Sequence, residues 1–384
     1  MRNRPIRVLF DAQRIFGNKT GVEYYTANLI ENLAKQYPTE LKLVGYHSGR
    51  QTGTPPVSDR NISYCHVWMP AKLINLLRRL HLPVPIELLT FQRADFVLYP
   101  NFLGLPSLAR TPYAPVIHDL AFIDLPEYVS KRNLHDLRAF VPSQMKGSGF
   151  VITVSKFGKK RIHDEFHIPN EKILVTHIPP IKPTPFTKAR QKAILDKLNI
   201  RSEYFLSLST VEPRKNVLGM LDAYSLLPES LQKKYTLVIA GATGWNCDKE
   251  LARLEQAAKE GKNIVRLNYV TAEQKAALYQ GSVFYASASH YEGFGMTPLE
   301  AMTYGKACAL SDIPVFREVA LDAALYFDKD SPQSIATAWS KLLIDTGYRS
   351  RMAQKGKRQA DSYHWSDVAE SLYNRIVMTL QDPK

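Results

Sequence analysis

Short apolar runs alternate with amphipathic or polar segments along most of the chain. "IRVLFDA" (6–12) is typical of a buried strand, and "GVEYYTANLIENLAKQY" (21–37) follows it with apolar residues at helical spacing. Further runs come at "LKLVGY", "FVLYP", "APVIHDL" and "GFVITVS", most of them followed by helical or polar segments. This strand–helix alternation predicts α/β architecture with a parallel sheet.

A proline-rich segment divides the pattern in two. Residues 179–186, "PPIKPTPF", contain four prolines, which prevent regular helix or sheet. The alternation restarts with "YFLSLST" (204–210), "YTLVIAG" (235–241), "NIVRLNYV" (263–270), "SVFYASAS" (282–289) and "ACALSD" (307–312). With 384 residues, we expect two doubly wound, Rossmann-like domains facing across a cleft, residues 1–180 and 181–364, and an amphipathic last helix at 365–380.

Composition narrows the class of protein. Hydrophobic residues make up 45% and charged residues 22%, as in an ordinary globular protein. Three cysteines without a CxxC pair indicate a reducing cytoplasm. No apolar stretch has the length of a membrane-spanning helix, so we expect any membrane contact to be peripheral.

The net charge of +14 is unevenly distributed, since residues 1–180 carry 23 Lys+Arg against 14 Asp+Glu. Such a field suits nucleic acid, anionic lipid headgroups or phosphorylated small molecules, and charge alone does not choose among them.

The stretch "HYEGFGMTPLEAM" (290–302) holds two acids, Glu292 and Glu300, around a glycine-rich turn. One interpretation of Glu300 is structural: Thr297 as N-cap with Glu300 three residues later forms a capping box. The other is functional, because a loop at the carboxyl end of a parallel strand borders the ligand crevice. Both interpretations of Glu300 stay open.

In the functional interpretation, the helix start and the glycines Gly293 and Gly295 would receive a diphosphate. The two carboxylates would accept hydrogen bonds from sugar hydroxyls on either side of it.

Three other segments could carry chemistry. In "STVEPRKN", Arg214 and Lys215 follow a predicted strand and could present a planar fork and a point charge to one diphosphate; otherwise they are a solvated basic pair. His118 in "VIHDLAF" is either structural or catalytic. Gly21 in "FGNKTGVEYY" lacks the GxGxxG spacing, so we expect no nicotinamide cofactor.

We also expect no metal site. Asp328 and Asp330 fit a surface turn, and His163 and His167 lack the H-E-x-x-H order of a zinc helix.

These segments, in this order, resemble a family 4 glycosyltransferase, the retaining, nucleotide-sugar-dependent class with the GT-B fold. The resemblance spans nearly the whole chain, and its most specific parts are the E-x7-E pattern from Glu292 to Glu300 and the Arg214–Lys215 pair. It rests on "KTGVEYYTANL", "VIHDLAFIDLPEYVS", "VITVSKFGKKRI", "STVEPRKN", "VIAGATGW", "HYEGFGMTPLEAMTYG" and "SDIPVFREVALDAALYFD".

The resemblance implies a role for each candidate residue. Arg214 and Lys215 would hold the donor diphosphate and stabilise its charge as it leaves, and Glu300 would hold the ribose hydroxyls. The transferred sugar and the phosphates would meet Glu292 and the backbone of Phe294, Gly295, Met296 and Thr297. His118 would face the sugar, Gly21 would lie near acceptor and phosphate, and the final helix (365–384) would cross back onto the first, acceptor-binding domain.

The resemblance also suggests the substrates. It favours a hexose donor, with mannose from GDP-mannose as the best choice, a glycan or lipid-linked acceptor, and a place in surface-polysaccharide or glycolipid synthesis. We expect transfer without a metal or another cofactor and attack on the same face, so that anomeric configuration is retained.

The enzyme would work in the cytoplasm, at the inner face of the plasma membrane if it is peripheral. Residues 71–89, basic and apolar together, could lie on anionic headgroups, or they could pack on their own sheet. The alternatives are a nucleic-acid-binding protein that uses the basic surface, for which we find no aromatic-interleaved motif, and a GT-B-fold epimerase or phosphorylase.

Overall fold

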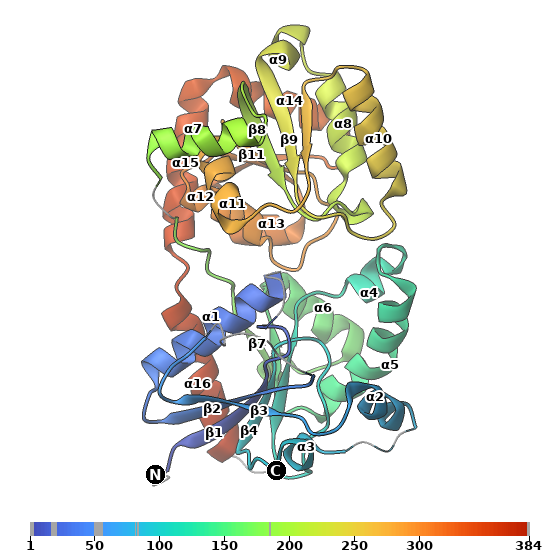
Figure 1. Cartoon of the computed structure of the whole chain (residues 1–384), viewed down its shortest axis with the longest axis vertical. Coiled ribbons are helices and arrows are strands. Elements are labelled where there is room, and N and C mark those ends of the chain that lie inside the picture. The colour runs from blue at the N-terminus through green and yellow to red at the C-terminus, as the bar shows by residue number, and fades with distance from the viewer. Residues whose placement is uncertain are drawn as a thin grey trace. The chain divides into compact units, whose positions relative to one another are not determined.

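The computed structural model of the chain describes residues 4–16, 21–49, 57–80, 82, 84–183 and 186–381. The chain forms two compact units (Figure 1). The first contains Met1–Ile123, Lys131–Ile178 and His364–Lys384, and the second contains Asp124–Ser130 and Pro179–Tyr363. Within the described residues, no helix combines the length and the apolar character that crossing a bilayer needs.

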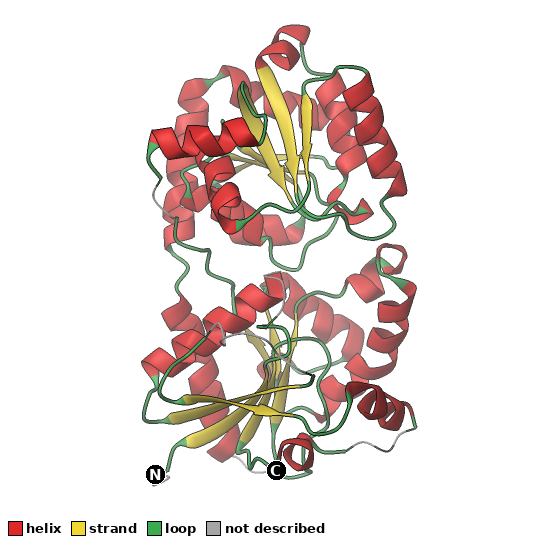
Figure 2. Ribbon diagram, viewed as in Figure 1, coloured by secondary structure: helices red, strands yellow, loops and turns green. Residues whose placement is uncertain are grey.

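The first unit is built on a parallel sheet of seven strands in the order β3-β2-β1-β4-β5-β6-β7 (Figure 2). Its strands are β1 Ile6–Asp11, β2 Leu41–His47, β3 Ile62–His66, β4 Phe96–Tyr99, β5 Tyr113–Ile117, β6 Val151–Thr153 and β7 Ile173–Val175. Its helical elements are α1 Gly21–Gln36, α2 Ala71–Arg79, α3 Ile86–Thr90, α4 Ala121–Asp124, α5 Lys131–Gly147, α6 Lys156–Phe166, η2 Asn170–Lys172 and α16 Trp365–Gln381.

The second unit repeats the plan with six parallel strands in the order β10-β9-β8-β11-β12-β13. Its strands are β8 Glu203–Leu208, β9 Tyr235–Ala240, β10 Ile264–Leu267, β11 Tyr285–Ser287, β12 Cys308–Ser311 and β13 Ala324–Phe327. Its helical elements are η1 Pro126–Tyr128, α7 Lys188–Lys197, η3 Pro213–Lys215, α8 Val217–Ser225, α9 Glu229–Lys234, α10 Asp248–Lys259, α11 Ala272–Gly281, α12 Met296–Thr303, α13 Pro314–Ala320, α14 Pro332–Ile344 and α15 Thr346–Asp361.

The strand order of the second sheet fixes where a ligand can bind. From β8 the chain moves outward through β9 and β10, then returns to the other side of β8 with β11. The helices that follow β8 and β11 therefore start on opposite sides, which opens a crevice at the carboxyl ends of these two strands. The sheet is held by a core in which Phe205 stacks on Phe284 at 4.8 Å between ring centroids and Trp339 is fully buried.

The end of the chain packs in the first unit, where α16 contacts α1. Tyr373 stacks on Tyr37 with 3.8 Å between ring centroids, and Leu372 and Ile376 are fully buried. An Arg375 guanidinium nitrogen donates a hydrogen bond of 2.6 Å to the Glu171 carbonyl. The chain thus leaves the first unit, builds the second and returns to the first.

The predicted α/β class with parallel sheets is confirmed, and the predicted runs fall on strands to within a few residues. Three strands were not predicted: β3, β7 and β13. All three lie at sheet edges, where one side lacks a neighbouring strand, and β3 has no fully buried residue. Such strands do not need the continuous apolar run that marks a central parallel strand.

Ile376→Ala should lower the free energy of unfolding by about 2–5 kcal/mol, because it leaves a cavity between α16 and the rest of the first unit. Urea unfolding measures the loss. Met378→Ala, two residues along the same helix but 60% exposed, is the matched control and should change stability little. Equal stability of the two variants would show that α16 does not support the first unit.

Candidate active site

The carboxyl ends of β8 and β11 bring three of the predicted residues together. Arg214 and Lys215 lie in η3, shortly after β8, and Glu292 lies in the loop between β11 and α12. The backbone N–H of His290 donates to the Arg214 carbonyl at 2.9 Å, which ties the two loops to each other. Residues far apart in sequence therefore meet in the crevice that the strand order creates.

Glu292 forms the centre of this group. Its Oε1 accepts hydrogen bonds from Lys215 Nζ at 2.6 Å and Ser289 Oγ at 2.8 Å, and its Oε2 accepts from Arg214 Nη1 at 3.1 Å. The side chains of Arg214, Lys215 and Glu292 are only 17%, 12% and 13% exposed. The contacts are thus charge-assisted and largely shielded from water, which makes them stronger than surface ion pairs.

A second acid, Glu212, holds Arg214 from the other side. Its Oε1 accepts from Arg214 Nε at 3.1 Å and Nη2 at 2.7 Å, while the Tyr291 carbonyl accepts from Nη1 at 2.9 Å. Glu212 is buried, and its Oε2 has no partner among the described residues. Sequence analysis did not single out Glu212; its place two residues before Arg214 in "VEPRKN" is the signal that could have found it.

The charges shift one another's pKa values. Burial raises the pKa of Glu292, but the attraction of Lys215 and Arg214 outweighs burial and lowers it to about 2. Burial and the neighbouring Arg214 lower the pKa of the Lys215 ammonium, and Glu292 and Glu212 oppose this shift. Two cations and two carboxylates thus balance when no ligand is bound, so an arriving anion would meet cations already fixed in position.

Glu300 does not cap its helix, so the capping-box interpretation is wrong. The helix α12 begins at Met296 with Gly295 as N-cap, and Thr297 is already inside it. Gly295 has φ +92°, and a Cβ there would lie 2.7 Å from the Phe316 ring, so only glycine lets the chain turn into the helix at this point. No side chain caps the amino end of α12.

Glu300 is instead held by α11. Its Oε1 accepts from Lys275 Nζ at 2.7 Å and its Oε2 accepts from Tyr279 Oη at 3.0 Å. Glu300 is buried, and Lys275 is 27% exposed at its side chain. Sequence reasoning missed Lys275 and Tyr279, because nothing in the local sequence around Glu300 points to a helix 25 residues earlier.

The turn between the two acids is tightly packed. Phe294 is buried, and its ring meets the Tyr363 ring edge to face with 6.1 Å between centroids. Gly293, Met296 and Thr297 are partly exposed. Thr297 Oγ1 accepts a hydrogen bond of 2.8 Å from Tyr285 Oη. The backbone from Gly293 to Thr297 is therefore fixed at the carboxyl end of β11, where the start of α12 leaves N–H groups for an anion.

His118 and Gly21 belong to the first unit. His118 follows β5, and its Nε2 hydrogen-bonds the Pro100 carbonyl at 2.8 Å. Burial lowers the pKa of His118, against the opposing effects of that carbonyl and Asp119. A neutral imidazole that donates through Nε2 keeps Nδ1 as an acceptor. Gly21 is exposed and is the first residue of α1.

Across the described residues, no cluster of three or more His, Cys, Asp or Glu side chains could hold a metal ion. Of the acids at positions 328 and 330, Asp330 forms an ion pair with Lys329. His163 forms a hydrogen bond with the Ile168 carbonyl through Nδ1.

Comparisons with known proteins find similarity to glycosyltransferases. Residues 190–359 match the family described as "Glycosyl transferases group 1". The chain is 28% identical over 382 residues to O-antigen chain mannosyltransferase B of Escherichia coli, an alignment that covers 96% of this chain and 99% of the relative.

Two solved structures share the fold. WaaG, a glycosyltransferase involved in lipopolysaccharide biosynthesis, superposes with a TM-score of 0.69 at 15% identity over 97% of this chain and 99% of its own. Anabaena Alr3699/HepE, in complex with UDP and glucose, superposes with a TM-score of 0.70 at 14% identity over 97% and 100%. Residues 190–359 thus match a glycosyltransferase group 1 domain, and the chain shares the GT-B fold of these two structures.

Proposed function

We propose that this glycosyltransferase transfers mannose from GDP-mannose to a glycan or lipid-linked acceptor in surface-polysaccharide synthesis, with retention of configuration and without a metal ion. The observation that carries the donor site is the shielded group of Arg214, Lys215 and Glu292 at the crevice of the second sheet. The choice of mannose rests on the full-length similarity to an O-antigen mannosyltransferase.

The catalytic contribution of this group is electrostatic. When the sugar departs, negative charge grows on the nucleoside diphosphate, and Arg214, Lys215 and the amino end of α12 would stabilise it. Because Glu212, Glu292 and the Tyr291 carbonyl already hold Arg214 in place, little reorganisation is needed at that moment. In this proposal Glu292 positions the cations as well as meeting the sugar.

Glu300 would hold the ribose hydroxyls through lone pairs that Lys275 and Tyr279 leave unused. Lys275 and Tyr279 would fix its orientation. His118 would meet the transferred sugar, and Gly21 would lie near the acceptor. Without a carboxylate placed as a nucleophile, the donor phosphate itself would accept the acceptor proton on the same face.

We also propose peripheral binding to an anionic membrane through the α2–α3 region. Within residues 71–89, Ile74 and Leu77 pack on the core of the first unit, whereas Leu73 and Leu76 are exposed and would face the lipid. Next to them, Trp68 is 54% exposed and stacks on Phe91, which is 80% exposed. Aromatic rings beside exposed leucines and basic residues suit a lipid interface.

The donor proposal predicts that GDP-mannose, among GDP-, UDP- and ADP-sugars, selectively stabilises the protein against thermal unfolding, and that the effect survives EDTA. Lys215→Ala should lower turnover at least about 100-fold, the scale of losing one preorganised donor. Lys233→Ala, a 75% exposed lysine on the same unit, is the charge-matched control and should leave turnover unchanged.

Each part of the donor proposal can fail separately. Near-normal turnover of Lys215→Ala would contradict the catalytic role of the cations. Selective thermal stabilisation by a UDP- or ADP-sugar would show that the donor is not GDP-mannose. Inverted anomeric configuration in the product NMR spectrum would contradict retention. If no nucleotide binds even at millimolar concentration, the nucleic-acid alternative returns.

The charge group also predicts a pH dependence of stability. Because the Glu292 pKa is about 2 in the folded protein against 4.5 ordinarily, its ionised form stabilises the fold above about pH 4.5, and this contribution disappears as the pH falls towards 2. The free energy of unfolding of the wild type should exceed that of Glu292→Gln by an amount that includes about 3 kcal/mol from the ionised carboxylate at pH 7. This contribution should fall to about half near pH 3.

Urea unfolding at both pH values measures the Glu292 contribution. Glu31→Gln removes an exposed ion pair with Lys35 and serves as control, with a small difference at either pH. A Glu292→Gln difference that stays constant between pH 7 and pH 3 would show that the pair with Arg214 and Lys215 does not hold the carboxylate ionised.

For the membrane proposal, Trp68→Ser with Phe91→Ser should reduce sedimentation with vesicles of anionic lipid several-fold, since two exposed rings are removed. Tyr269→Ser, a 65% exposed ring on the second unit, is the control. Equal sedimentation of the double variant and the wild type would place membrane binding, if any, elsewhere.

A further inference from the structure

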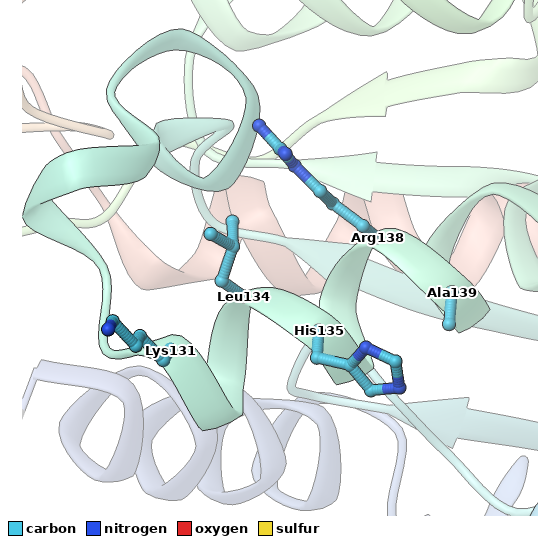
Figure 3. A pocket seen from close by; sticks show the side chains of 5 residues that line it. All are labelled: Lys131, Leu134, His135, Arg138 and Ala139. Carbon is cyan, nitrogen blue, oxygen red and sulfur yellow. The ribbon is translucent and has the colours of Figure 1, made fainter.

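The first unit carries an open pocket along α5, lined by none of the residues of the candidate active site (Figure 3). Its volume is about 500 Å³, within the range of small-molecule sites. The described residues that line it are Lys131, Leu134, His135, Arg138 and Ala139, all from the first half of this helix. In Figure 3, Leu134 and Arg138 point to one side of the helix and His135 to the other.

The pocket concentrates positive charge without an acid to balance it. Lys131 and Arg138 are basic residues, and no Asp or Glu is among the described lining residues. The side chains of Lys131 and His135 are exposed and form no hydrogen bond or ion pair with the described part of the chain. Arg138 is held by its Nε, which donates to the Phe122 carbonyl at 3.1 Å, so its terminal nitrogens remain for a ligand.

In two other helices of the same unit, lysine side chains form ion pairs within the helix. Lys35 pairs with Glu31 in α1, and Lys160 pairs with Asp164 in α6, each one helical turn apart. In α5 the first turn has no acid and begins with Lys131, although the amino end of a helix favours negative charge. The charge of Lys131 therefore adds to the positive end of the helix dipole, which favours an anion bound nearby.

We propose that this pocket binds a phosphate monoester or diphosphate group. The Arg138 fork and the Lys131 ammonium supply the charge-assisted hydrogen bonds that a phosphate takes, and Leu134 and Ala139 give an apolar surface for the attached organic group. Such a phosphate belongs either to a soluble phosphorylated ligand, such as a glycan acceptor bearing a phosphate, or to a headgroup in a bilayer. The site lies in the first unit and does not depend on the proposed donor site.

Inorganic pyrophosphate is the probe, titrated by calorimetry into the full chain. Lys215→Ala is the common background, because pyrophosphate would also bind the donor cations. In this background, Lys131→Gln with Arg138→Gln should weaken pyrophosphate binding at least about tenfold, as expected when charge-assisted contacts are lost. Lys131→Gln alone, at an exposed side chain, should weaken it severalfold without changing the thermal unfolding temperature. Lys146→Gln, an exposed cation in the last turn of the same helix, is the matched control with unchanged binding.

Sedimentation with vesicles of anionic lipid separates the two sources of phosphate. Loss of pyrophosphate affinity with unchanged vesicle binding assigns the pocket to a soluble ligand, and loss of both assigns it to a bilayer headgroup. Pyrophosphate affinity that is the same in the control, the Lys131 variant and the double variant would overturn the proposal. Nucleotide stabilisation of Lys131→Gln with an intact Lys215 tests the donor site separately.

Discussion

The ion pairs that Glu292 makes with Arg214 and Lys215 are the contacts on which the site depends. They join the loop after β8 to the loop after β11, two segments that the sheet makes neighbours but the sequence keeps far apart. The positive charges of Arg214 and Lys215 repel one another, and burial removes the water that would stabilise each charge. Glu292 and Glu212 offset both penalties, so the cations remain ordered where they can act on an anion.

The parallel sheets supply the frame for this arrangement. Every strand ends in the same direction as its neighbours, so loops that carry polar residues gather at one edge of each sheet. The reversal of strand order between β8 and β11 then leaves room at that edge. The glycine at position 295 lets α12 start at this edge, and the first N–H groups of the helix have no intrahelical partner.

The two acids of the E-x7-E pattern are alike in sequence but differ in surroundings. Glu292 lies between two cations of its own sheet edge, whereas Glu300 is buried against Lys275 and Tyr279 of α11. The local pattern around Glu300 fitted a helix cap equally well, because capping and ligand binding use the same residue types. The start of α12 at Met296 and the contacts of Glu300 with α11 rule out the cap.

The sequence by itself determined the α/β class and the central strands, because buried parallel strands leave long apolar runs. It also singled out Arg214, Lys215 and Glu292 as candidate site residues, which the fold brings together. It did not determine the edge strands or the start of α12. It also did not show that Glu212 contacts Arg214, that Lys275 contacts Glu300, or that α5 lines a pocket with basic residues. Those features depend on which faces are covered by distant segments and which charges find partners. Such contacts join residues tens of positions apart, and only the tertiary structure decides them.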